Sequence, residues 1–155
     1  MAKKTLVAST LAHQLVDDGA KFVRFLAEQG LPIASAMWIK LSENEPWRLY
    51  ISTPNVEKHG PIAVYKFIDK ALRRLKIESF EFNDVVAANT TNHFVNAFTS
   101  VIRMEDGIVV FVDCTLSGVP VQEAVVFISN KSAAATREMP QIRPVKKGKE
   151  AIAVP

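Results

Sequence analysis

Residues 108–129 read IVVFVDCTLSGVPVQEAVVFIS and contain the strongest β-strand pattern in the chain. Two runs rich in branched and aromatic residues, at 108–115 and 121–129, flank Ser117-Gly118, which is typical of a tight turn. The pattern predicts an antiparallel β-hairpin. A second hairpin is predicted upstream, because runs 35–42 and 47–53 have the same composition and flank a turn-forming cluster of five residues at 42–46.

Two helices are expected from apolar residues that repeat at helical spacing. The first covers residues 6–29, ends at Gly30 and Pro32, and contains Gly19, which we expect to mark a bend. The second begins at Gly60-Pro61 and ends near residue 75. Their predicted buried faces carry Leu11, Leu15, Phe22, Phe25 and Leu26 in the first helix, and Ile62, Tyr65, Ile68, Leu72 and Leu75 in the second.

Residues 76–106 have the least regular pattern. A short strand is predicted at 84–88, followed by a third helix in which Phe94, Phe98, Val101 and Ile102 share a face, with residues 89–91 as its cap. A strand over 91–103 is the alternative, because Asn, Thr and Ser are poor helix formers. The element order α-β-β-α-β-α-β-β then predicts an α+β fold, a single mixed sheet of about five strands with about three helices mostly on one face.

The positive charge is concentrated at the C-terminal end. Residues 1–130 hold 13 Lys or Arg and 14 Asp or Glu, whereas residues 131–155 hold six and two. We therefore expect one domain over 1–130, followed by a basic, proline-containing tail that needs a partner to become ordered. Its partner-binding cations are Arg137, Arg143, Lys146, Lys147 and Lys149. Within the domain, one basic cluster stands out, and it consists of Lys66, Lys70, Arg73, Arg74 and Lys76.

Motifs for catalysis and cofactor binding are missing from the sequence. The six glycines are too scattered for a phosphate-cradling loop, no Cys or His pairs have zinc-ligand spacing, and we expect no metal and no cofactor. Cys114 alternates with apolar residues along a strand, as a buried small side chain does. His93, in the first turn of the third predicted helix, is the candidate functional histidine, and an enzyme built around it is the weakest of three hypotheses.

The favoured hypothesis is a non-enzymatic module that associates with itself or with another protein. Trp38, Trp47 and Tyr50 on the first hairpin are its predicted interface residues. The alternative is a nucleic-acid-associated protein that uses the basic tail and the Lys66–Lys76 helix as phosphate contacts. Without a continuous apolar signal or a membrane-length segment, the chain is expected to be cytoplasmic, with no membrane partner.

The order of these elements resembles that of short bacterial α+β proteins with no assigned activity. The resemblance covers residues 30–129 and rests on the Trp38–Pro54 hairpin, Gly60-Pro61 with Tyr65, the segment Asp84–Ile102 and the closing hairpin. It implies an α+β fold and no particular function.

Overall fold

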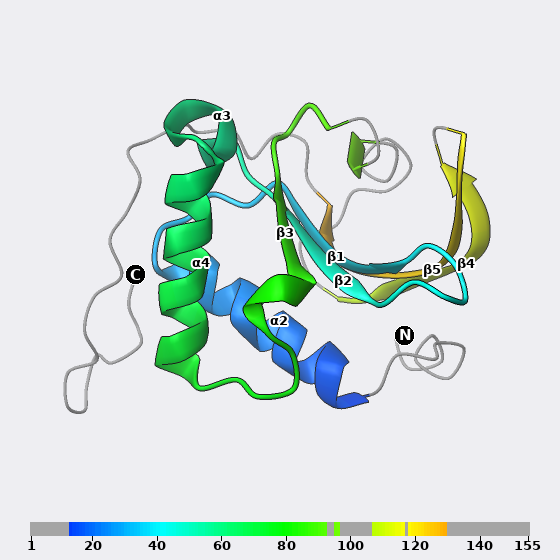
Figure 1. The fold of residues 1–155 in the computed structure, drawn as a ribbon, viewed down its shortest axis with the longest axis horizontal. Coiled ribbons are helices and arrows are strands. Elements are labelled where there is room, and N and C mark those ends of the chain that lie inside the picture. The colour runs from blue at the N-terminus through cyan, green and yellow to red at the C-terminus, as the bar shows by residue number, and fades with distance from the viewer. Residues whose placement is uncertain (1–12, 93–94, 97–106, 117, 130–155) are drawn as a thin grey trace.

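The computed structural model describes residues 13–92, 95–96, 107–116 and 118–129 (Figure 1). It is an α+β structure with one mixed sheet of five strands in the order β3-β2-β1-β5-β4. The strands are β1 (Ser35–Lys40), β2 (Arg48–Ser52), β3 (Val85–Ala88), β4 (Val109–Leu116) and β5 (Val119–Ser129). The helices of the described residues are α2 (His13–Glu28), α3 (Asn55–His59) and α4 (Pro61–Leu75), with the 3₁₀ turn η1 (Phe82–Asp84).

Both predicted hairpins are confirmed. β1 pairs antiparallel with β2, with Trp38 opposite Leu49, and β4 pairs antiparallel with β5. The two hairpins join through β1 and β5, whose register shifts between Ala36 and Met37. The sheet is mixed because β3 pairs in parallel with β2, and the chain between them crosses over through α3 and α4.

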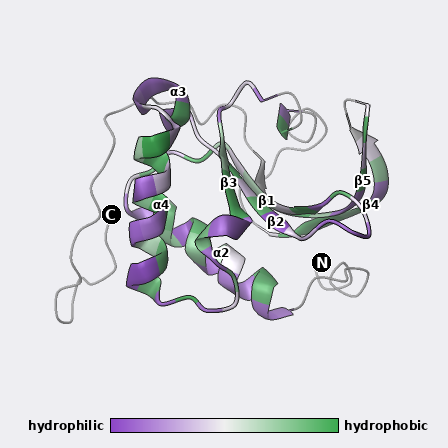
Figure 2. Ribbon diagram, viewed as in Figure 1, coloured by the Kyte–Doolittle hydropathy of each residue, from purple (hydrophilic) through white to green (hydrophobic). Residues whose placement is uncertain are grey.

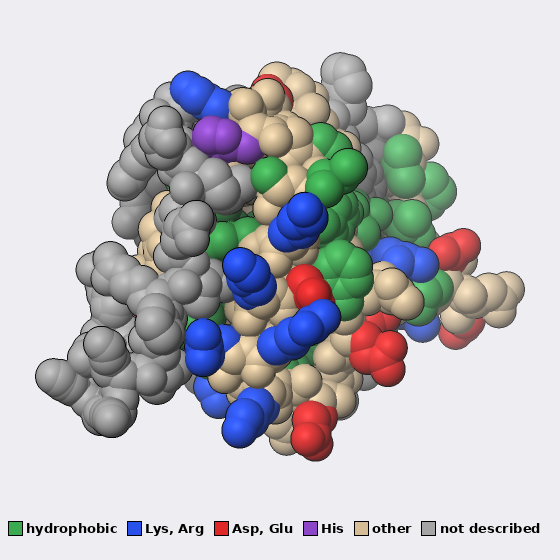
Figure 3. All heavy atoms as spheres, turned by 60° about the vertical axis from the view of Figure 1, so that its left-hand side comes forward, with side chains coloured by type: hydrophobic (Ala, Val, Ile, Leu, Met, Phe, Trp, Pro, Cys, Tyr) green, Lys and Arg blue, Asp and Glu red, His purple; other side chains and the backbone are tan. Residues whose placement is uncertain are grey.

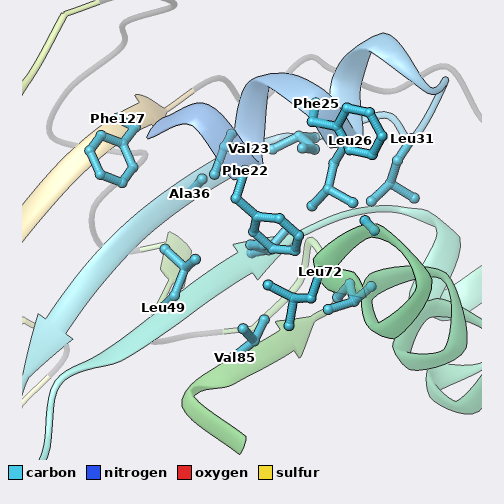
Figure 4. Packing of buried hydrophobic residues seen from close by; sticks show 14 of the residues in the cluster. Phe22, Val23, Phe25, Leu26, Leu31, Ala36, Leu49, Leu72, Val85 and Phe127 are labelled. Atoms are coloured by element: carbon cyan, nitrogen blue, oxygen red, sulfur yellow. The ribbon is translucent and has the colours of Figure 1, made fainter. Parts of the chain in front are cut away.

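Helices α2 and α4 cover one face of the sheet (Figure 1), as the predicted layer arrangement requires. Figure 4 shows Phe22 and Leu26 of α2 and Leu72 of α4 lying over Leu49 and Val85 of the sheet. All five of these side chains belong to one buried cluster. On the other face, a smaller cluster contains Met37, Ile39, Ala88, Val95, Val121, Ala124 and Val126.

The predicted buried face of α4 is wrong at its first residue. Ile62 is 70% exposed, whereas Ile68 and Leu72 are buried as expected. The buried residues of α4 are Val64, Phe67, Ile68, Ala71 and Leu72. Successive members of this set are alternately three residues and one residue apart, so they form one stripe along the helix, rotated about the axis from the predicted stripe. Figure 2 shows the resulting alternation of hydrophobic and hydrophilic bands along α4.

Gly19 allows α2 to approach the sheet closely. A Cβ built on it would lie 2.5 Å from Nε1 of Trp38 and 3.2 Å from the ring of Phe127. The indole N–H of Trp38 donates a hydrogen bond of 3.1 Å to the carbonyl of Leu15, one turn earlier in the helix. The glycine is therefore explained by the indole that crosses it, which the helix pattern alone did not show.

Other features of the connections were missed or fall outside the described residues. The segment read as a break before α4 forms the short helix α3. Of the third predicted helix, Val95 and Asn96 are described and helical, and the Asn92 side chain accepts a hydrogen bond of 2.9 Å from the Val95 N–H, as an N-cap does. Three predicted segments lie outside the described residues: residues 93–94 and 97–103 of this helix, residues 6–12 of the first helix, and the tail at 131–155.

Candidate nucleic-acid interface

The outward surface of α4 carries a row of cations. Because five side chains of this helix point into the core, the opposite side faces outward. Figure 3 shows Lys and Arg side chains following one another over this surface. We call Lys66, Lys70, Arg73, Arg74 and Lys76 the basic face, and all five are exposed. The sequence predicted this cluster, and the structure places it on the outside of the molecule.

Carboxylates neutralise little of the basic face. Between Asn55 and Lys76 the chain has six Lys or Arg and two acidic residues. Arg73 forms an ion pair of 2.9 Å with Asp69, one turn away, and the Arg73 side chain is 77% exposed. Among the described residues this is the only ion pair, so Lys66, Lys70 and Arg74 have no carboxylate partner there. The surface is thus suited to an external anion.

A pair of aromatic residues, Tyr65 half-buried and Phe82 exposed, borders the basic face. Tyr65 of α4 and Phe82 of η1 make an edge contact with ring centroids 5.6 Å apart. Phe82 is 37% exposed, and Ile62 is exposed on the same helix as Tyr65. We call Ile62, Tyr65 and Phe82 the aromatic corner. At 100° per residue, Ile62 lies between Tyr65 and Lys66 around the α4 axis, so the two surfaces are continuous.

Hydrogen bonds fix the elements that carry the aromatic corner. The Tyr65 hydroxyl accepts a hydrogen bond of 2.9 Å from the Ala87 N–H on edge strand β3. The η1 turn has reciprocal capping by Glu81 and Asp84, and Arg48 donates a hydrogen bond of 3.1 Å to the Asn83 carbonyl. The side chain of Phe82 therefore projects from a turn held at both of its sides.

The predicted interface on the first hairpin is wrong at Trp38. This side chain is 1% exposed and packs edge-on against Phe80 at 5.2 Å inside the core, so it has no surface to offer a partner. Trp47 and Tyr50 are half-buried, and burial raises the pKa of the Tyr50 phenol. Their role in an interface stays a prediction. His93 and the tail residues Arg137, Arg143, Lys146, Lys147 and Lys149 lie outside the described residues.

A polar contact missed by sequence reasoning joins α2 to the loop after α4. Asp18 accepts hydrogen bonds from the Ser79 hydroxyl at 2.6 Å and from the Gln14 amide at 3.0 Å. These bonds, with Lys21 nearby, hold the pKa of the Asp18 carboxyl below its usual range. Asp18 is thus a weak base, and the contact is suited to fixing the loop rather than to activating the Ser79 hydroxyl.

The remaining described residues add little chemistry. Burial raises the pKa of the Cys114 thiol, a backbone hydrogen bond opposes this, and the charge of Asp113 adds a smaller increase, so little nucleophilic thiolate forms near neutral pH. No group of three His, Cys, Asp or Glu side chains in the described ranges is placed to hold a metal ion. Over those same ranges, no helix has the length and apolar character needed to cross a membrane.

Comparison with known proteins gives no match to a family, to a curated protein or to a solved structure.

Proposed function

We propose that this protein is a non-enzymatic nucleic-acid-binding module and that the basic face of α4 contacts the phosphates. The observation that supports it most is the row of exposed cations with a single ion pair among the described residues. Cations clustered along one helix face are the electrostatic footprint of a nucleic-acid-binding domain. The aromatic corner beside it adds side chains that can contact bases.

The distribution of charge over the rest of the structure is consistent with a specific face. The turn between β1 and β2 carries Glu43 and Glu45, both exposed. Figure 3 shows acidic side chains both among the cations and around them, with the cations in the majority along α4. Residues 1–130 are close to neutral as a whole, so attraction of a polyanion has to come from the local clustering of cations on the surface. A phosphate backbone would meet the protein along α4.

Reversing two charges on the basic face tests this proposal. We expect the double variant Lys66→Glu, Lys70→Glu to bind a fluorescent oligonucleotide of about 20 nucleotides at least tenfold more weakly, and to lower the salt slope by about one unit per lost contact. Fluorescence anisotropy over a series of salt concentrations measures both quantities. Lys21→Glu with Arg24→Glu changes the net charge equally on α2 and serves as the matched control. Equal weakening by the two double variants would show a general charge effect and contradict a site on α4.

Self-association is the second candidate function, and the exposed apolar side chains of the second hairpin favour it. Val112 on edge strand β4 is 49% exposed and Val119 on β5 is 37% exposed. Asp113 opposes strand pairing at this edge, because its φ of 48° interrupts the extended backbone next to Val112. Light scattering at high protein concentration separates the candidates: a mass near 17.2 kDa contradicts self-association, and a multiple of it supports self-association.

A further inference from the structure

We propose that the α4 site prefers single-stranded nucleic acid to a duplex, with Phe82 as a stacking platform for a base. This inference rests on the proposed function and adds the class of nucleic acid that the site takes. Aromatic side chains bind single strands because an unpaired base offers its face for stacking, whereas a duplex keeps its bases stacked on one another. The aromatic corner is the only part of the site that would distinguish the two.

The position of Phe82 suits this role. Its ring makes an edge contact with Tyr65, and the residue keeps 37% of its surface exposed although it is apolar. Phe80, two residues earlier, is 4% exposed and points into the core. The chain thus places one phenylalanine inside and the next one outside, at the border of the basic face.

Phe82 is held in place before any ligand arrives. The hydrogen bond from the Ala87 N–H to the Tyr65 hydroxyl fixes the ring against which Phe82 packs. The caps of η1 and the bond from Arg48 to the Asn83 carbonyl fix the backbone on its other side. Because little freedom remains to be lost on binding, stacking on this ring has a small ordering cost.

The length of the basic face matches a short stretch of single strand. Lys66 and Arg74 are eight residues apart, which corresponds to about 12 Å along a helix axis. At about 3.4 Å per phosphate, the spacing along one strand with its bases stacked as in B-form DNA, this distance covers three or four phosphates. A site of this size is at the lower end of the range for modules that bind single strands by charge and stacking.

The test compares binding of oligo(dT), oligo(U) and a DNA duplex, each of about 20 nucleotides, to the full chain by fluorescence anisotropy. Phe82→Leu keeps the apolar bulk and removes the aromatic face, so we expect the preference for both single strands over the duplex to fall about fivefold or more. Phe82→Tyr keeps the face and should keep the preference. A stronger loss for oligo(U) than for oligo(dT), or the reverse, identifies which single strand the platform favours.

The outcomes separate this inference from the proposed function. If Phe82→Leu leaves the preference unchanged while Lys66→Glu with Lys70→Glu weakens binding, stacking is refuted and the nucleic-acid function stands. If the unmodified chain binds neither single strand nor duplex, the proposed function itself fails. A second readout does not depend on the stability of the leucine variant: in Phe82→Trp, oligo(dT) should quench the fluorescence of the introduced indole and the duplex should not. Equal quenching by both also overturns the preference.

Discussion

Replacing Trp38 by alanine lowers the free energy of unfolding by about 3–5 kcal/mol, which is a large share of the total stability of a domain this size. The indole is 1% exposed, packs against Phe80 at 5.2 Å, and donates its N–H to the Leu15 carbonyl. Alanine leaves a cavity between α2 and the sheet and removes the donor. Urea unfolding followed by circular dichroism measures the change.

The same substitution at Trp47 is the matched control. Trp47 is half-buried and packs at the edge of the core, so Trp47→Ala should cost clearly less than Trp38→Ala. If Trp38 served an interface between copies, its loss would change the mass in solution and leave the stability of the single chain nearly intact. An equal or smaller cost at Trp38 than at Trp47 would contradict the core position.

A substitution at Gly19 tests the contact between α2 and the Trp38 indole in a second way. Alanine at Gly19 favours a helix by about 1 kcal/mol, but its methyl group would lie 2.5 Å from the Trp38 indole, and overpacking costs about 1–3 kcal/mol. In a Trp38→Phe background the indole nitrogen is gone, and the closest remaining contact of the methyl group is the Phe127 ring at 3.2 Å. We therefore expect Gly19→Ala to cost less in that background than in the natural chain. Identical costs in both backgrounds would show that the two residues are not coupled.

The sequence predicted the elements whose patterns are local. Both hairpins and α4 are recognised from runs of fewer than about 25 residues, because turn chemistry and helical spacing depend on neighbours in the chain. The parallel pairing of β2 with β3 depends on residues far apart, Leu49 opposite Val85, and β3 is only four residues long. No local pattern identifies such a partner.

The errors at Trp38 and Ile62 have the same origin. Large apolar residues occur on both faces of the β1–β2 hairpin, so the sequence left open which face meets a helix and which faces outward. Ile62 lies in the first turn of α4, and its spacing from the apolar residues further along the helix is compatible with a shared buried face. The sheet does not cover Ile62, however, so its side chain is exposed. In each case the local period was read correctly, and the non-local partner decided the burial.

The candidate site was predicted in part. Lys66, Lys70 and Arg73 have spacings of four and three residues, which place them on one side of the helix, and Arg74 and Lys76 extend the cluster in the sequence. The aromatic corner was missed, because Tyr65 was assigned to the core stripe and Phe82 lies in a turn with no clear pattern. The alternation Phe80-Glu81-Phe82 gave no help, because residues two apart in an extended run are expected on the same side, whereas here Phe80 is buried and the turn η1 leaves Phe82 exposed.

The different burial of Phe80 and Phe82 predicts a large difference between two identical substitutions. Phe80→Ala should lower the free energy of unfolding by about 3–5 kcal/mol, because Phe80 is buried and makes edge contacts with Phe22 at 5.8 Å and with Trp38. Phe82→Ala should cost about 1 kcal/mol, since Phe82 is partly exposed and loses one aromatic contact. Urea unfolding of both variants measures the difference, and binding of oligo(dT) measures their function.

In the binding assay the order of the two variants should be reversed, so that Phe82→Ala loses more affinity for oligo(dT) than Phe80→Ala does. At low temperature, where Phe80→Ala still folds, its affinity for oligo(dT) should fall less than that of Phe82→Ala, because Phe80 has no surface with which to contact a base. Equal losses of stability at the two positions would contradict the inward and outward orientation of the rings. A larger loss of oligo(dT) affinity for folded Phe80→Ala than for Phe82→Ala would place the stacking surface elsewhere. The segment after α4 therefore combines a core residue and a proposed binding residue two positions apart, and only the burial of each distinguishes them.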